Sequence, residues 1–337
     1  MMLNNKFELK NTWLILLMLA TVSCAKQKPK EFSNYETLQL PKEIIVRQTL
    51  FISDKVGFVV GGKRSNHGYL YKTTDGGASW ELKYDVDDYN LYVIHFMDSL
   101  NGILCGESMR YYYTQDGGES WNRQFMWPNL PQMQKDMSDF KKIVEYNDTT
   151  LLMVCGDDYN EGVLFRINTN HKNWTFEEKD AELSGLTIYN QKVFVSGFGY
   201  VGEYDFDADS VYQKEQHGDF YVAIHAFSET DLLMAGNEGK FYQSKDGGEN
   251  WNVVDRKSKL STKRWIINDM LFLNDNEGVA IGNYGLILYS SNKGEDWKEF
   301  RLPEKEMLYS ISTQNDNIYL ATEKGKIIKV KLADLRE

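Results

Sequence analysis

An all-β fold, a propeller of seven four-stranded antiparallel blades, is predicted by three features of the sequence. First, the pattern Thr/Ser-x-Asp-Gly-Gly-x-x-Trp recurs along the chain. Second, short runs of β-branched and aromatic residues alternate with turn residues, as in antiparallel strands. Third, the units follow one another at about 40 residues, a period typical of propeller blades. The copies of the pattern are TTDGGASW at 73–80, TQDGGESW at 114–121, SKDGGENW at 244–251 and the weaker SSNKGEDW at 290–297.

The spacing of the units gives the number of blades. Aligned on the position seven residues before each motif Asp, successive units are separated by 41, 53, 40, 37, 46 and 40 residues. Seven registers therefore predict seven blades. Blade 2 shows the arrangement best, with four strand-like runs separated by turns. The aligned positions are Gly68, Met109, Gly162, Gly202, Gly239, Gly285 and Gly325, and the runs of blade 2 are 91–98, 102–107, 110–115 and 120–126.

The recurring motif is interpreted as a hairpin turn between the third and fourth strands of a blade. Its Asp can accept hydrogen bonds from backbone N–H groups of its own turn. The two Gly residues provide positive φ angles, and the Trp can fill the wedge between blades. An Asp that recurs at equivalent corners cannot be a single catalytic acid. The residues given this structural role are Asp75, Trp80, Asp116, Trp121, Asp246, Trp251, Asn292 and Trp297.

The two ends of the propeller are expected to pair. Residues 308–332 offer three strands without a fourth, and Tyr35–Leu40 is an alternating strand without a blade. Pairing them completes blade 7 and removes an exposed sheet edge. The propeller is therefore expected over 35–332, followed by a C-terminal tail at 333–337.

The N-terminus is typical of an exported lipoprotein. Lys6 and Lys10 precede the apolar run 12–22, which is too short for a transmembrane helix. The following TVSC resembles a bacterial lipobox, so we expect a signal peptide at 1–23, lipidation of Cys24 and a polar tether at 24–34. An ordinary signal peptide with an incidental Cys24 is the alternative. The expected location is the bacterial cell envelope, at the outer membrane.

Charge and cysteine content exclude some classes of partner and site. The net charge is −11, which disfavours binding to nucleic acid. Cys105 and Cys155 each lie in an apolar run, which favours buried thiols, although a disulfide between them is the alternative in an exported protein. No Cys/His spacing indicates a metal site, and no motif indicates a cofactor.

The motif and the blade pattern resemble the Asp-box, or BNR repeat, of sialidases, sortilin-type receptors and related propellers. The whole blade, exemplified by INDMLFLNDNEGVAIGNYGLILYSSNKGEDW at 267–297, is most similar to the photosystem II stability/assembly factor family. The likeness spans roughly 45–332. It implies a seven-bladed propeller that acts as an assembly chaperone rather than an enzyme. The shared residues are those that make the fold, so the resemblance does not imply photosynthesis.

The function predicted from these observations is a non-catalytic, membrane-anchored scaffold, assembly factor or binding module that uses one face of the propeller. The partner would be a protein or a glycan of the cell envelope, and we expect a monomer. Loops between the second and third strands share a face with the connections between blades, including the apolar insertion 126–137 and the basic loop 255–265. The residues expected to bind there are Trp127, Tyr159, Tyr200, Tyr284, Arg264 and Trp265.

A carbohydrate-active hydrolase, or a glycan-binding propeller, is the alternative. A glycosidase needs two carboxylates about 5–9.5 Å apart across a cleft. A sialidase needs an Arg triad and an early Arg-Ile-Pro segment, whereas this chain has only nine Arg residues and no Arg-Ile-Pro. No catalytic residue is therefore assigned. Facing carboxylates at the channel mouth would favour the hydrolase, whereas aromatic and mixed polar loops would favour a binder.

Overall fold

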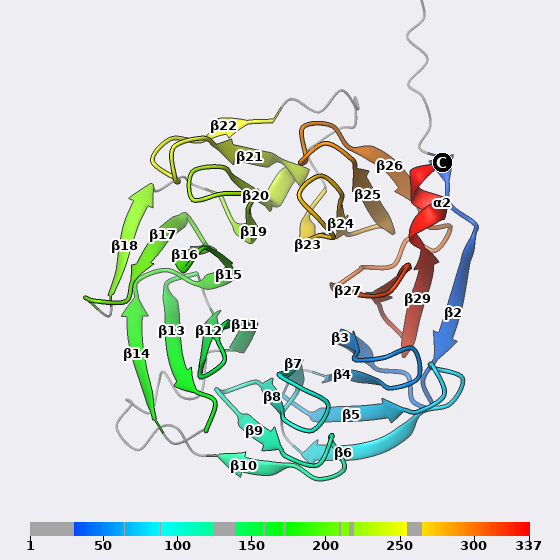
Figure 1. The fold of residues 1–337 in the computed structure, drawn as a ribbon. Helices are drawn as coiled ribbons and strands as arrows, with labels where there is room; N and C mark the ends of the chain where they lie inside the picture. The colour runs from blue at the N-terminus through cyan, green and yellow to red at the C-terminus, as the bar shows by residue number, and fades with distance from the viewer. Residues whose placement is uncertain are drawn as a thin grey trace, which may run out of the picture.

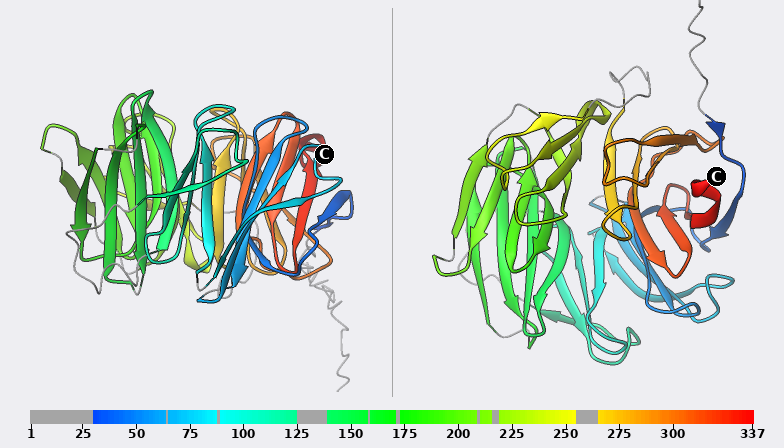
Figure 2. Two further views of the ribbon diagram at one scale, coloured as in Figure 1. Left: turned by 90° about the horizontal axis from the view of Figure 1, so that it is seen from below. Right: turned by 45° about the horizontal axis from the view of Figure 1, so that its top comes forward.

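The predicted seven-bladed propeller is confirmed by the structure. Seven antiparallel sheets stand around one axis, with the first strand of each blade nearest the centre (Figure 1). Viewed edge on, the blades form a thick disc (Figure 2). The structure is a computed structural model that describes residues 30–63, 65–87, 89–124, 139–157, 159–170, 173–208, 210–215, 219–254 and 265–337.

The strands follow one another from the axis outward in every blade. Their bounds are β3 Ile45–Phe51, β4 Gly57–Lys63, β5 His67–Thr73 and β6 Glu81–Asp87 in blade 1; β7 Leu91–Phe96, β8 Gly102–Gly106, β9 Tyr111–Thr114 and β10 Asn122–Gln124 in blade 2; β11 Asp139–Asn147, β12 Thr150–Asp157, β13 Glu161–Asn168 and β14 Trp174–Lys179 in blade 3; β15 Leu183–Tyr189, β16 Lys192–Gly197, β17 Tyr200–Asp205 and β18 Ser210–Glu215 in blade 4; β19 Tyr221–Ala226, β20 Leu232–Gly236, β21 Phe241–Ser244 and β22 Asn252–Val253 in blade 5; β23 Ile267–Phe272, β24 Gly278–Gly282, β25 Leu286–Ser290 and β26 Lys298–Arg301 in blade 6; and β27 Ser310–Gln314, β28 Asn317–Ala321 and β29 Lys326–Lys331 in blade 7.

The ring closes as the sequence predicts. Strand β2 (Tyr35–Gln39) pairs antiparallel with β29, from Tyr35 opposite Val330 to Gln39 opposite Lys326. In Figure 1 the blue β2 lies along the red β29. The chain also makes a contact that the sequence did not indicate, because β1 (Lys30–Glu31) pairs in parallel with β26 of blade 6. The N-terminal segment therefore spans the junction of blades 6 and 7.

The hydrophobic core is divided among the wedges between neighbouring blades. The wedge between blades 2 and 3 contains both internal cysteines, which are free thiols and fully buried. Burial raises the pKa of Cys105 and of Cys155 far above the ordinary thiol range. The predicted buried thiols are therefore found, and the disulfide alternative is not formed.

The C-terminal tail forms a short helix against blade 6. Helix α2 (Leu332–Arg336) buries Leu335. The Arg336 guanidinium donates to both oxygens of Glu277, at 2.7 and 2.8 Å. This bidentate contact and the hydrogen bond that the Tyr289 hydroxyl donates to Glu277 lower the pKa of Glu277 to about 2. Among the described residues, no helix has the length and apolar character needed to cross a membrane.

The repeated motif forms the local turn expected from its sequence. In blade 1, the Thr73 hydroxyl donates to Asp75 Oδ1 at 2.7 Å, and Ser79 N donates to the same oxygen at 2.9 Å. Gly76 and Gly77 have φ angles of +75° and +95°, which only Gly adopts easily. Blades 2 and 5 repeat these bonds around Asp116 and Asp246. Each of the three carboxylates thus accepts hydrogen bonds from its own hairpin turn.

These turns are expected to be sensitive to acid. Hydrogen bonds from the side chain and backbone of Ser79 and from Thr73 lower the pKa of Asp75 to about 2. Equivalent bonds from Asn250 and Ser244 lower the pKa of Asp246 to about 2. Because these folded-state pKa values lie below the unfolded value, the ionised carboxylates stabilise the fold at neutral pH, and that contribution is lost as the pH falls from about 4 to about 2.

Asn292 supplies the control, because it makes the same turn in blade 6 without a charge. Substituting Asn for Asp75, Asp116 and Asp246 together should therefore flatten the dependence of stability on pH between about 4 and 2. Urea unfolding midpoints measured across that range test this. If the unfolding midpoint of the triple variant falls with pH as steeply as that of the wild type, the structural role of the three carboxylates is contradicted.

Candidate functional site

The candidate site lies on the top face, which consists of the loops between the second and third strands of each blade together with the connections between blades. Tyr159 and Tyr284 lie on this face and are exposed, at 61% and 46%. Trp265 lies there too and is half-buried. Trp127, Arg264 and Cys24 lie outside the described residues.

Three aromatic side chains gather over blades 3 to 5, and we call them the Tyr159 cluster. Tyr159 lies 4.8 Å from Phe198 and 6.5 Å from Phe220 between ring centroids, and the two Phe rings are 6.2 Å apart. Phe198 is 39% exposed. The rings come from a blade 3 loop, a blade 4 loop and the connection to blade 5, so the cluster joins three blades.

Backbone hydrogen bonds hold the Tyr159 cluster in place. Glu182 N donates to the Tyr159 carbonyl at 3.2 Å, and Phe198 N donates to the Glu182 carbonyl at 2.9 Å. Phe198 and Phe220 form an isolated β-bridge. Since the loops are fixed before a ligand arrives, little ordering entropy would be lost on binding.

A second group, the Trp265 cluster, consists of Trp265, Tyr284 and Arg301 on blade 6. The rings of Trp265 and Tyr284 meet edge to face at 5.7 Å. The Arg301 guanidinium lies over the Trp265 ring at 3.6 Å and donates to Glu299 at 2.7 Å. The structure therefore brings two of the residues expected from the sequence into contact, and it adds a stacked cation.

Tyr200 departs from the expectation of an exposed ring. It is the first residue of β17 rather than a loop residue, and it is only 5% exposed. Its ring packs in the core between blades 3 and 4, and burial raises the pKa of its hydroxyl well above the ordinary value. Tyr200 is therefore left out of the surface considered below.

The central channel opens beside the Tyr159 cluster and has a volume of about 440 Å³. Phe220 belongs to both. In six blades the first strand carries an irregularity in register against the second strand at the same place, and the residue skipped there lines the channel. Such bulges turn a side chain out of the regular alternation. The skipped residues are Arg47, Tyr92, Lys141, Ser184, Val222 and Asn268.

Arg47 lies between two aromatic rings at the channel. Its guanidinium is 5.0 Å from the ring centroids of Tyr92 and of Tyr309, which belong to the blades on either side. Three buried polar atoms of channel residues have no hydrogen-bond partner in the described structure: Arg47 Nε, Ser184 Oγ and Ser310 Oγ. Because unpaired buried polar groups are costly, these atoms indicate that the channel accepts a polar ligand or water.

The carboxylates among the described channel residues are already engaged. Glu182 lies 3.3 Å from Lys141. Asp269 accepts from the backbone N–H groups of Met270 and Ile311, each at 2.9 Å. Lys142 reaches it from blade 3, at 3.5 Å. Among the described channel residues, therefore, neither carboxylate is a free acid facing another across a cleft, and the lining is aromatic and mixed polar.

Sequence reasoning missed the residues that complete these surfaces. Phe198 lies two residues before the predicted Tyr200, between β16 and β17, and its place next to Gly199 could have been recognised. Phe220 lies in the connection to blade 5. Arg47 gave no such signal, because it lies within a first strand and reaches the channel only through the bulge. The alternating pattern of a regular strand does not reveal a bulge.

Comparison with known proteins gives the same architecture. Two overlapping matches to the family described as "Photosynthesis system II assembly factor YCF48" cover residues 27–224 and 204–333. A curated relative, "Photosystem II assembly lipoprotein Ycf48" of Synechococcus sp. (strain CC9902), is 21% identical over an alignment of 329 residues that covers 91% of this chain and 90% of the relative.

Two solved structures share the fold. "YCF48 bound to D1 peptide" matches with a TM-score of 0.69 at 20% identity, over 90% of this chain and 97% of that one. "YCF48 from Cyanidioschyzon merolae" matches with a TM-score of 0.68 at 17% identity, over 89% and 100%. The family description and the name of the Synechococcus relative both refer to assembly, which supports a non-catalytic scaffold or assembly factor over the hydrolase. Because the family match spans most of the sequence, the chain belongs to the photosynthesis system II assembly factor YCF48 family.

Proposed function

We propose that this protein is an exported assembly factor that holds a segment of an envelope protein on its top face. The observation that carries the proposal is the Tyr159 cluster, in which Tyr159 and Phe198 remain 61% and 39% exposed although they contact each other. Exposed aromatic groups on fixed loops are the features that dominate protein-binding surfaces. Apolar side chains of a bound segment would cover these rings.

The channel mouth would supply the polar part of recognition. Arg47, Ser184 and Ser310 offer donors that lack partners within the described protein. A peptide carries backbone carbonyls and carboxylates that can accept from them. The related structure "YCF48 bound to D1 peptide" supports this class of ligand, so a peptide segment is the ligand that we assign to this chain.

The experiment is photocrosslinking in the source bacterium. Phe198 is replaced by a photoreactive benzoylphenylalanine, which keeps an aromatic ring in the cluster. Tyr212 receives the same replacement as the matched control, because it is 54% exposed but lies on the outer strand β18. Discrete protein adducts at position 198 and not at 212 are expected, and adding Tyr159→Ala should weaken them. Equal adducts at both positions, or adducts unaffected by Tyr159→Ala, would refute the proposal.

The attachment to the membrane is proposed to be a lipid on Cys24, at the outer membrane. The lipobox-like TVSC at 21–24 supports this, as does the word lipoprotein in the name of the Synechococcus relative. We expect Cys24→Ala to move the protein from the membrane pellet to the soluble fraction, since acyl chains provide most of the membrane affinity. Fractionation with immunoblotting measures this. Cys24→Ala protein that still pellets in full would contradict a lipid anchor.

A further inference from the structure

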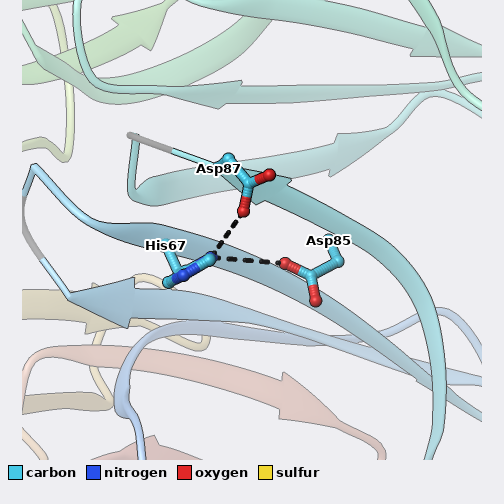
Figure 3. A group of neighbouring side chains, drawn as sticks. All are labelled: His67, Asp85 and Asp87. Atoms are coloured by element: carbon cyan, nitrogen blue, oxygen red, sulfur yellow. Dashed lines mark ion pairs between the residues drawn. The ribbon is translucent and has the colours of Figure 1, made fainter.

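Three potential metal ligands meet on the outer strands of blade 1. His67 is the first residue of β5, and Asp85 and Asp87 lie on the neighbouring β6 (Figure 3). The antiparallel register sets His67 opposite Asp87 and Tyr69 opposite Asp85. Because side chains alternate along a strand, all three ligand residues project from the same side of this strand pair. Figure 3 shows both carboxylates directed toward the imidazole.

The spacing of the ligand atoms suits a small divalent ion. His67 Nδ1 lies 3.1 Å from Asp87 Oδ1 and 3.6 Å from Asp85 Oδ1, and the three ligand atoms lie within 4.8 Å of one another. An ion bound at about 2.0–2.2 Å to nitrogen and oxygen separates neighbouring ligands by roughly 3.0–3.5 Å. Two of the three separations are therefore close to those required. Asp87, whose side chain is 84% exposed, is free to adjust the third.

The cluster is poorly explained as an ion pair alone. His67 Nδ1 is buried and has no hydrogen bond, even though both carboxylates are near it. The two carboxylates around the imidazole carry two negative charges, and Lys42, which lies 3.9 Å from the other oxygen of Asp85, offsets only one of them. A divalent ion would provide the imidazole nitrogen with a partner and neutralise both carboxylates.

Neighbouring groups hold the ligands in position. The His67 ring stacks on Tyr69 with centroids 5.8 Å apart. The Lys42 ammonium group lies over the Tyr69 ring, 4.3 Å from its centroid. Lys42 belongs to the connection from β2 to β3, where the ring closes. The cluster therefore lies beside the junction of blades 7 and 1, away from the aromatic clusters of the proposed peptide site.

We propose that His67, Asp85 and Asp87 bind a divalent transition-metal ion of the zinc class, through one imidazole nitrogen and two carboxylate oxygens, with water as the remaining ligand. The ion links β6 to β5 and so stabilises blade 1 beside the ring closure. The sequence did not indicate the site, because His67 and Asp87 are distant along the chain and meet only through strand pairing.

The test is zinc titration of the full chain, purified without a polyhistidine tag and stripped with chelator. Calorimetry should detect one site in the wild type, and zinc should raise the melting temperature, because an ion that binds only the folded state stabilises it. His67→Asn and Asp85→Asn should each weaken that site by at least about tenfold. Asp87→Asn should do the same, and it leaves the fold intact because its side chain is exposed.

His95→Asn is the matched control. His95 also pairs with a carboxylate, Glu145 at 2.7 Å, but it is not part of the three-ligand group. Its substitution should leave the zinc affinity unchanged. The proposal is overturned if the wild type binds no zinc, or if His67→Asn and Asp87→Asn bind it as tightly as the wild type. It is also overturned if His95→Asn causes the same loss as His67→Asn.

Discussion

A chain that begins at Pro41 is expected to melt at least about 10 °C below a chain that begins at Lys30. The longer chain keeps β1 and β2, whereas the shorter one lacks them. Three apolar side chains of the removed segment are almost fully buried: Phe32, Leu38 and Leu40. Each buried side chain of this kind stabilises the fold by about 1.5–3 kcal/mol. For a domain of this size, each kcal/mol corresponds to about 2–4 °C in melting temperature.

The loss of β2 has a second effect, because it leaves β29 as an uncovered edge strand in blade 7. The shorter chain should therefore also aggregate on heating. Scanning calorimetry or circular dichroism measures both chains under the same conditions. The chain from Lys30 is the control, since it lacks only residues 1–29 and keeps every described residue. Equal melting temperatures would show that β1 and β2 do not hold the ring together.

The blade architecture could be predicted because its signals are local and repeated. The turn around Asp75 is made by residues within six positions of one another, and each copy reports the same hairpin. The closure by β2 followed from counting strands, since an unpaired edge is unfavourable. The pairing of β1 with β26 could not be foreseen, because two residues, Lys30 and Glu31, carry no periodic pattern.

The candidate site was predicted only in part, because it depends on geometry that spacing does not encode. Tyr159 was expected to be exposed from its place in a loop, and it is. Tyr200 is buried because β17 begins one residue earlier than the loop pattern suggested. Arg47 reaches the channel through a bulge, and His67 meets its carboxylates through cross-strand register. Strand boundaries, bulges and register are the properties that single-sequence patterns determine least well.

Trp297→Ala is expected to be the most damaging single substitution among the motif tryptophans. Trp297 is 6% exposed. Its ring stacks on Phe241 of blade 5 at 4.5 Å and meets Phe272 of blade 6 edge to face at 6.1 Å. Truncation therefore leaves a cavity between two blades. Losses of about 3–5 kcal/mol are typical when a buried aromatic residue is replaced by Ala.

Trp251 is the matched control, because it occupies the same motif position in blade 5 but is only partly buried. Its indole N–H donates to the Gly248 carbonyl at 3.0 Å, whereas Trp297 Nε1 is buried without a partner in the described structure. Trp297 therefore stabilises the fold through packing, whereas Trp251 also contributes a local hydrogen bond. Urea unfolding of both Ala variants should show the larger loss for Trp297→Ala. A larger loss for Trp251→Ala would mean that the turn, rather than the wedge between blades, is what the motif tryptophan stabilises.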